Sequence, residues 1–268
     1  MFRFWRWVAD HWVMVIGLLV LAYLFLPIVV VFLLSLNKPS NRLSYDLSDQ
    51  WTLDYWLNPF GTAGLGDALR VSVGIALVAT LVATILGTLM SFALARHRFR
   101  GRATTNVLIF LPMATPEVVM GSSLLALFVT LQIPLGFWTV AVAHILFCLS
   151  FVVVTVKARL AGLDPKLQEA AMDLYAGEWQ TFRRITLPLV APGIVAAALL
   201  SFSLSFDDFI ITNFNSGTTV TFPMFVWGAA QRGIPPQINV IGTLMFLLAL
   251  ALVLGGELGS RRRRALRA

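Results

Sequence analysis

Residues 169–188 read EAAMDLYAGEWQTFRRITLP, and this polar stretch interrupts a chain that is otherwise dominated by apolar residues. Acidic and basic side chains follow one another closely in it, and long hydrophobic runs flank it on both sides. A segment of this composition belongs in water, whereas its two neighbours avoid water. The stretch therefore predicts an aqueous connection between two membrane-spanning segments.

Local spacing predicts a short helix at the start of this connection. Asp164 is a suitable N-cap, Pro165 suits the first helical position, and Gly177 can end the helix. Apolar residues recur at i, i+3, i+4 and i+7, which places them on one face: Leu167, Ala170, Ala171 and Leu174. Such a face fits either an ordinary amphipathic linker or a helix that docks in a groove of another protein.

Acidic residues on the same helix favour a basic partner. Glu169 and Asp173 lie four residues apart, a like-charge pair that weakens an isolated helix by roughly 0.2–0.5 kcal/mol. Lys166 relieves this repulsion in part, and positive charge on a partner would relieve more of it.

The composition identifies the class of protein. The chain has 268 residues, of which 58% are hydrophobic and 12% charged, and its mean hydropathy is +0.83. A soluble domain would need far more polar surface, so runs of about 20 apolar residues are interpreted as membrane spans. The single cysteine, Cys148, excludes a disulfide framework. The chain is expected to be an all-α integral membrane protein.

Six apolar segments are long enough to be predicted as transmembrane helices: 12–36, 68–95, 104–131, 138–156, 190–213 and 238–256. The second has a stripe of small residues at helical spacing, which predicts close helix packing: Ser72, Ala76, Ala79, Ala83, Gly87 and Ser91.

The spans suggest three parts. Residues 1–65 hold the first span and an external loop, residues 66–256 hold a core of five spans with a cytoplasmic loop at 157–189, and residues 257–268 form a basic cytoplasmic tail.

Charge placement predicts the orientation. Sixteen of the 20 Lys and Arg residues fall in the segments that lie on one side when both termini are cytoplasmic, and four fall on the other side. The net charge of +7 thus follows the positive-inside rule and gives no indication of nucleic-acid binding. The tail Arg261–Arg264 is interpreted as a topology anchor, with an anionic-lipid or nucleic-acid patch as the alternative.

Motifs for catalysis are absent from the sequence. It has no G-x-x-x-x-G-K-[ST] loop for ATP, no nucleophile elbow and no cluster of metal ligands. His11, His97 and His144 are far apart, and His144 within a span is expected to be hydrogen-bonded packing. We therefore expect no enzyme activity, cofactor or metal, and any ATP hydrolysis is expected on another subunit.

Three carboxylates fall inside the predicted spans: Glu117, Asp207 and Asp208. Charges at this depth are costly and usually belong to a pathway or a paired structural site. No Lys or Arg within the spans offers a partner. A cation pathway is one interpretation. Alternatively, Thr115 and Pro116 begin a helix, and the charge of Glu117 interacts favourably with the dipole of that helix. The aspartate pair would then lie at the solvent-exposed outer end of its span.

The loop resembles the "EAA loop" through which permease subunits of ATP-binding-cassette (ABC) importers contact their ATPases. The matching positions are Glu169, Ala170, Ala171, Ile185, Leu187 and Pro188. Tyr175 stands where the family usually has glycine, and Gly177 follows two residues later. The resemblance implies the type I (MetI-like) permease fold and assigns these residues to ATPase coupling: Glu169, Ala170, Ala171, Asp173, Leu174 and Gly177.

Three further segments resemble permeases of spermidine/putrescine ABC importers, most closely the second permease subunit of that system. They are FLPMATPEVVMGSSLL (110–125), SFSLSFDDFIITNF (201–214) and INVIGTL (238–244), and the resemblance covers most of residues 66–256. It implies that the three acids handle a polycation. Aromatic side chains are candidates for cation–π contacts in that pathway: Phe206, Phe209 and Trp227.

The resemblance also implies partners. These are a sibling permease, two ATP-binding subunits and an extracytoplasmic substrate-binding protein, assembled in the cytoplasmic membrane among its lipids. The expected function is polyamine import by alternating access. Thiamine, ferric iron or another small solute on the same fold is an alternative, and an ion-coupled secondary transporter is a second one that the loop argues against.

Overall fold

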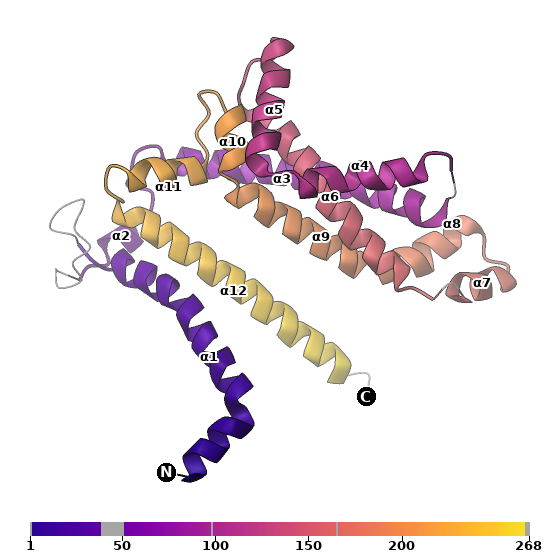
Figure 1. The fold of residues 1–268 in the computed structure, drawn as a ribbon, viewed down its shortest axis with the longest axis horizontal. Helices are drawn as coiled ribbons and strands as arrows, with labels where there is room; N and C mark the ends of the chain where they lie inside the picture. The colour runs from indigo at the N-terminus through magenta and orange to yellow at the C-terminus, as the bar shows by residue number, and fades with distance from the viewer. Residues whose placement is uncertain (1, 39–50, 98, 165, 266–268) are drawn as a thin grey trace. The chain divides into compact units, whose positions relative to one another are not determined.

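The computed structural model describes residues 2–38, 51–97, 99–164 and 166–265, and these residues are predominantly helical (Figure 1). An isolated bridge pairs Asn37 with Trp51. The chain forms two compact units, one from residues 1–66 with 226–268 and one from residues 67–225. The last predicted span packs against the first span within one of these units.

The first unit is built on two long helices and a short one: α1 (Phe2–Ser35), α2 (Asp54–Leu57) and α12 (Pro236–Ala265). The rings of Phe25 and Phe246 meet edge to face at 6.1 Å, which packs α1 against α12. The indole Nε1 of Trp56 donates a hydrogen bond to Ser35 Oγ at 3.1 Å and joins α2 to the end of α1.

The second unit contains the segments that the sequence singled out. Its elements are α3 (Leu65–Arg96), α4 (Arg102–Ala114), α5 (Glu117–Thr130), α6 (Phe137–Ala161), α7 (Lys166–Asp173), α8 (Glu178–Thr181), the π-helical turn η1 (Phe182–Thr186), α9 (Leu187–Asp207) and α10 (Ile210–Asn215). The helix α11 (Phe222–Ala230) begins at its end.

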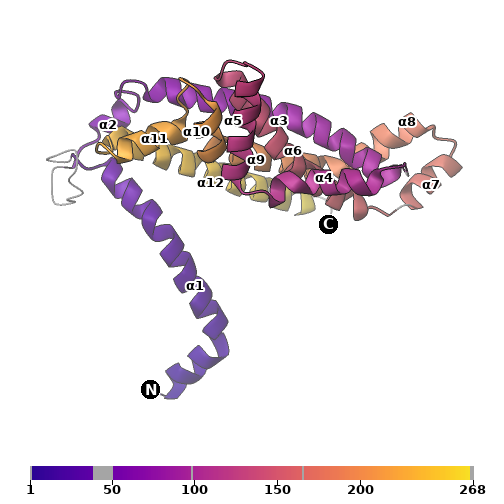
Figure 2. The same ribbon diagram turned by 45° about the horizontal axis from the view of Figure 1, so that its top comes forward.

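Five of the described helices are long and apolar enough to cross a membrane, and α4 with α5 supplies the sixth candidate as a broken pair. The two helices of this pair are bent by 106° (Figure 2). The predicted span at 104–131 is therefore a broken one, with its break at residues 115 and 116. Pro112 and Pro116 lie on either side of Thr115, and proline restricts the residue before it to extended backbone, which ends α4.

The small-residue stripe of α3 is buried along its whole length, as the sequence predicts. A Cβ atom added to Gly87 would lie 2.6 Å from a Val152 methyl carbon on α6. Ser91 Oγ also donates to the carbonyl of Val153 at 3.1 Å. Close approach of α3 and α6 requires glycine at this position because any side chain would overlap α6.

Helices α6 and α9 pack along each other at the centre of this unit. Their apolar contacts form one core cluster with residues of α3 and α10, and its buried members include Ala83, Phe147, Cys148, Ala197 and Ile211. This cluster holds the end of α9 and the start of α10 in place, and the aspartate pair lies between them.

Candidate functional site

The helix α9 stops at Asp207, and a new helix, α10, begins three residues later at Ile210. Asp208 between them has extended backbone, with φ −64° and ψ 124°. Its carboxylate accepts hydrogen bonds from the backbone N–H groups of Ile211 and Thr212 at 3.3 and 2.8 Å. Phe209 is the N-cap residue of α10, and the carboxylate of Asp208, one residue before it, satisfies two N–H groups of the first helical turn.

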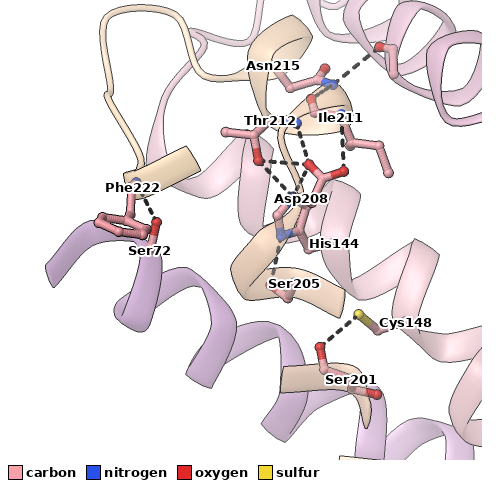
Figure 3. A network of polar contacts seen from close by, with 11 residues as sticks. Ser72, His144, Cys148, Ser201, Ser205, Asp208, Ile211, Thr212, Asn215 and Phe222 are labelled. Atoms are coloured by element: carbon pink, nitrogen blue, oxygen red, sulfur yellow. Dashed lines mark hydrogen bonds and ion pairs between the residues drawn. The ribbon is translucent and has the colours of Figure 1, made fainter. Parts of the chain in front are cut away.

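The same carboxylate is held from the opposite side by a histidine of α6 (Figure 3). His144 Nε2 lies 3.2 Å from Asp208 Oδ2 and 3.0 Å from Thr212 Oγ1, and its Nδ1 lies 2.7 Å from Ser205 Oγ. Thr212 Oγ1 also donates to Asp208 Oδ2 at 2.9 Å. The His144 and Asp208 side chains are only 1% and 3% exposed. We call these four residues the His144 cluster.

This cluster answers the question of what pairs with a carboxylate inside a span. The sequence offered no Lys or Arg, but the structure places His144 against Asp208 from 64 residues away. A buried charge without such a partner is strongly destabilising, so this contact is part of the fold. Hydrogen-bonded packing, the role expected for His144, agrees with this geometry.

Glu117 and Asp207 differ from Asp208 because their side chains are exposed. Asp207 is the last residue of α9, and Glu117 is the first residue of α5. Glu117 begins α5, and α5 packs against α10, the helix that follows the two aspartates along the chain. Two of the three acids, Glu117 and Asp207, are thus accessible at the ends of neighbouring segments.

The helix α5 begins differently from the sequence prediction. Its N-cap is Pro116, whose carbonyl accepts the first helical hydrogen bond from Val119 at 2.9 Å. Thr115, the predicted N-cap, instead turns back and donates its hydroxyl to the carbonyl of Leu111 at 2.7 Å. Glu117 still lies in the first turn, where a negative charge interacts favourably with the helix dipole.

A second set of contacts ties α5 to α10. Asn215 Nδ2 donates to the carbonyl of Gly121 at 3.2 Å and to that of Ile211 at 2.9 Å. A Cβ atom at Gly121 would lie 2.9 Å from the ring of Phe214, so the two helices touch at this glycine. The helix that positions Glu117 is thereby attached to the helix that Asp208 caps.

Aromatic rings line up next to the aspartates. Phe206 stacks between Phe202 and Phe222, with ring centroids 6.0 and 5.9 Å away. The backbone N–H of Phe222 donates to Ser72 Oγ at 2.8 Å, which fixes the end of the stack on α3 (Figure 3). Phe209, at the break itself, is partly buried. Trp227 belongs to the other compact unit and is 57% exposed.

The predicted loop helix is present as α7. Asp164 Oδ1 accepts the backbone N–H of Lys166 at 3.0 Å, which is the expected N-cap contact, while Pro165 lies outside the described residues. Leu167, Ala170 and Leu174 are exposed as expected of a docking face. The fourth predicted member, Ala171, is instead buried against the chain's own loop. The predicted face is therefore narrower by one residue.

The C-terminal end of α7 corrects a second prediction. Tyr175 adopts φ +59°, Ala176 N donates to the carbonyl of Ala171 at 3.0 Å, and Tyr175 N donates to that of Met172 at 2.9 Å. These are the two hydrogen bonds of a Schellman motif, with Tyr175 in the left-handed position that usually holds glycine. Gly177, which was expected to end α7, has φ −66° and precedes α8 as its N-cap.

Polar and aromatic contacts connect the loop to α3. Thr186 Oγ1 receives hydrogen bonds from Gln168 of α7 at 3.3 Å and from Arg96 of α3 at 3.0 Å. Phe182 meets Phe92 of α3 edge to face at 5.3 Å and stacks on Trp179 at 5.5 Å. The loop is therefore connected directly to the ends of α3 and α9.

Residues 83–261 match the family described as "Binding-protein-dependent transport system inner membrane component". The chain belongs to this family. A permease of this family from Haemophilus influenzae, "Spermidine/putrescine transport system permease protein PotC", is 39% identical over 91% of this chain and 94% of its own length. The PotC protein of Escherichia coli K12 is 37% identical over 90% of both chains. The "Putrescine transport system permease protein PotI" of the same strain is 36% identical over 89% of this chain and 86% of its own.

Solved structures of other importers support the fold of this family member. A bacterial ABC transporter involved in the import of the acidic polysaccharide alginate contains a chain that superposes with a TM-score of 0.68 at 16% identity. The match covers 97% of this chain and 99% of that one. A chain of the MetNI methionine ABC transporter superposes with a TM-score of 0.58 at 16% identity, over 75% of this chain and 95% of that one. The all-helical permease fold expected from the sequence is confirmed.

Sequence reasoning about this permease found the three acids but missed the residues that hold one of them. His144, Ser205 and Thr212 are ordinary members of apolar spans, and their spacing along the chain gives no sign that they meet. The available signal was indirect. A carboxylate within a span without a Lys or Arg partner leaves a buried histidine as the remaining candidate.

Proposed function

We propose that this chain is a transmembrane permease subunit of an ATP-driven importer of spermidine or putrescine. The observation that supports this most is the pair of accessible carboxylates at two helix termini, Glu117 at the start of α5 and Asp207 at the end of α9, in a chain whose 36–39% identical relatives are named as polyamine permeases. A polyamine is a flexible chain with several ammonium groups. Carboxylates that the protein leaves unneutralised attract such a cation during its passage.

The three acids have different roles in this proposal. Glu117 and Asp207 are exposed and contact the cation directly as it passes. Asp208 has its oxygens occupied by protein donors and contributes through its field and by capping α10. Phe206 is the middle ring of an aromatic stack beside Asp207, and the outer faces of the end rings, Phe202 and Phe222, are the surfaces for cation–π contact with the alkylammonium chain.

Coupling takes place at α7. In this proposal the exposed face of Leu167, Ala170 and Leu174 enters a groove on one of two cytoplasmic ATPases, and the acids Glu169 and Asp173 meet basic residues there. Movement of α7 is passed through Thr186 to Arg96 and α9, whose far end holds the aspartates. A sibling permease and an extracytoplasmic binding protein complete the importer in the cytoplasmic membrane, with both termini of this chain in the cytoplasm.

The competing functions predict different responses to neutral variants. An importer of an anion or an uncharged solute should tolerate the loss of Glu117 and Asp207, whereas an importer of thiamine or ferric iron should keep a need for them with another cargo. An ion-coupled secondary transporter would work without the ATPases, so the exposed apolar face of α7 would have no partner.

The experiment is uptake and ATP hydrolysis by the assembled complex in proteoliposomes supplied with the binding protein and radiolabelled spermidine. Wild type should take up spermidine in an ATP-dependent manner, and both Asp207→Asn and Glu117→Gln should lower uptake at least about tenfold, the effect of losing one interaction between charged groups. Asp67→Asn is the matched control, because this aspartate is 83% exposed and pairs with neighbouring Arg70 on the surface of α3.

Each result decides between the candidates. Uptake of spermidine that equals the wild type in both variants would remove the acids from the pathway. Hydrolysis of ATP without any polyamine uptake would exclude polyamine as the cargo, and the same assay would then be run with thiamine and ferric iron. Uptake that continues without the ATPases would contradict the importer itself.

A further inference from the structure

His144 has a defined hydrogen position. Asp208 Oδ2 only accepts hydrogen bonds, and Thr212 Oγ1 gives its own hydrogen to that oxygen. The ring nitrogen that faces both atoms, Nε2, therefore carries a hydrogen. Nδ1 faces the hydroxyl of Ser205, which can donate to a neutral ring or accept from a charged one. In either protonation state the N–H that points at Asp208 is the same one.

That N–H completes the coordination of Asp208. Its two carboxylate oxygens receive the backbone N–H groups of Ile211 and Thr212, the Thr212 hydroxyl and the His144 N–H. Three of these four donors come from α10, and only His144 comes from another part of the chain. His144 is thus the contact in this cluster that fixes the start of α10 against α6.

The start of α10 in turn positions both exposed acids. Asp207 immediately precedes Asp208, so its direction follows from the backbone of the break. At the other end of α10, Asn215 donates to Gly121 of α5, one turn beyond Glu117. A rotation of α10 would therefore move Asp207 directly and Glu117 through α5.

We propose that His144 is a positioning residue for transport: its Nε2–H anchors Asp208 and thereby sets the direction and separation of Asp207 and Glu117. This inference rests on the proposed import function. His144 does not contact the substrate, since its side chain is 1% exposed. Substitution of His144 should lower the number of cations transported per ATP hydrolysed. ATP hydrolysis should continue because the α7 contacts remain intact, whereas the two accessible acids are no longer held in position.

The test compares two substitutions of His144 whose amide groups lie at different distances from the backbone. In His144→Gln the side-chain N–H can occupy the place of Nε2–H, whereas in His144→Asn the amide reaches only as far as the ring atom Nδ1 and meets Ser205. The measurement is the amount of spermidine delivered per ATP hydrolysed by the reconstituted complex. His144→Asn should lower this ratio about tenfold, as expected for one lost hydrogen bond to a charged group, and His144→Gln should stay within about threefold of the wild type.

A matched control lies one turn further along α6. Cys148 is buried and faces α9, where its thiol donates a hydrogen bond to the carbonyl of Ser201 at 3.5 Å. Cys148→Ala disturbs the packing of α6 and α9 without changing a contact of Asp208. It should reduce the amount of assembled complex at most, and the ratio of spermidine to ATP should remain that of the wild type.

The outcomes separate this inference from the function on which it rests. Equal ratios in wild type, His144→Asn and His144→Gln would overturn the positioning role while leaving polyamine import established. An equal fall for both amides and for Cys148→Ala would also overturn it, since general packing would then explain the loss. Absence of spermidine uptake by the wild type would reject both proposals together. If His144→Asn fails to assemble, His144→Phe keeps a ring of similar shape but lacks the N–H, and a wild-type ratio in that variant overturns the inference.

Discussion

The α9–α10 break and the α7 loop lie at opposite ends of the second unit (Figures 1 and 2), and they differ in how far their side chains are buried. At the break, the buried carboxylate of Asp208 accepts hydrogen bonds from residues of the same chain. At the loop, Leu174, Tyr175 and Trp179 are 82%, 99% and 68% exposed. The first region has its contacts within the chain, whereas the second leaves large apolar side chains exposed, which the proposed docking on an ATPase would cover.

The largest effect is expected where this chain supplies every partner itself. Asp208→Asn places an amide donor among the donors that now surround the carboxylate, so it disrupts the contact with His144 and the capping of α10 together. We expect a loss of about 3 kcal/mol in stability, because several buried donors lose the charged acceptor that they share. The measurement is the thermal unfolding of the purified complex in detergent.

Asp207→Asn is the control for this comparison, since the two residues are neighbours of the same type. Asp207 is exposed at the end of α9, so its neutral variant should unfold within about 0.5 kcal/mol of the wild type, as surface substitutions usually do. Equal destabilisation by the two variants would contradict the division of these aspartates into a structural and an accessible one.

The loop should show the reverse pattern. Leu174→Asp should leave the stability of the isolated permease unchanged but weaken ATPase binding by about 2 kcal/mol, the value of burying one leucine side chain, or roughly thirtyfold in Kd. The measurement is co-purification and titration of the ATPase on the permease pair. Gln180→Ala on exposed α8 is the control and should bind the ATPase as the wild type does. Normal binding by Leu174→Asp would exclude this face from the interface.

The difference between the two regions also explains what the sequence could reveal. The loop is a local structure: the capping by Asp164 and the apolar spacing of α7 depend on residues within about three turns, so the helix was predictable. The cluster is a non-local structure, because it joins positions 61 to 68 residues apart along the chain. In spans that are apolar on every face, no periodicity tells which helices meet or which way a side chain points.

The adjacent aspartates show the limit most clearly. The sequence assigned both to the cation pathway because they share a residue type and a position. Their different surroundings follow from one backbone angle, the extended ψ of 124° at Asp208, which turns this side chain back onto α10. The end of α7 was missed for a related reason. Glycine preference pointed to Gly177, but the backbone hydrogen bonds of α7 place the left-handed residue at Tyr175.

A smaller effect is expected at the contact between α5 and α10. Gly121→Ala would place a methyl group 2.9 Å from the Phe214 ring and 3.3 Å from the Ile211 Cα, so the two helices must separate slightly. We expect a cost of about 1–2 kcal/mol, typical of overpacking, and a fall in spermidine uptake per ATP because Glu117 moves with α5. Gly255→Ala, where nothing lies within 4 Å of the added carbon, is the control. An unchanged uptake ratio in Gly121→Ala would show that α5 and α10 are not coupled.

The smallest effect concerns the strained residue of the loop. Tyr175→Gly should stabilise the end of α7 by about 1 kcal/mol, because glycine enters the left-handed region without the steric cost of a side chain. Slower hydrogen exchange of the Tyr175 and Ala176 amides, which form the Schellman bonds, would report this gain.

Tyr175→Ala separates the two roles of this tyrosine, because alanine keeps the backbone strain while removing the exposed ring. If the ring contacts the ATPase, both variants should weaken ATPase binding equally, although only the glycine variant slows exchange. If binding is instead strengthened by glycine and unchanged by alanine, the ring has no partner and the strain alone limits docking. The second result would remove Tyr175 from the surface that binds the ATPase. That surface would then consist of Leu167, Ala170 and Leu174, and the contrast with the α9–α10 break would depend on these three residues.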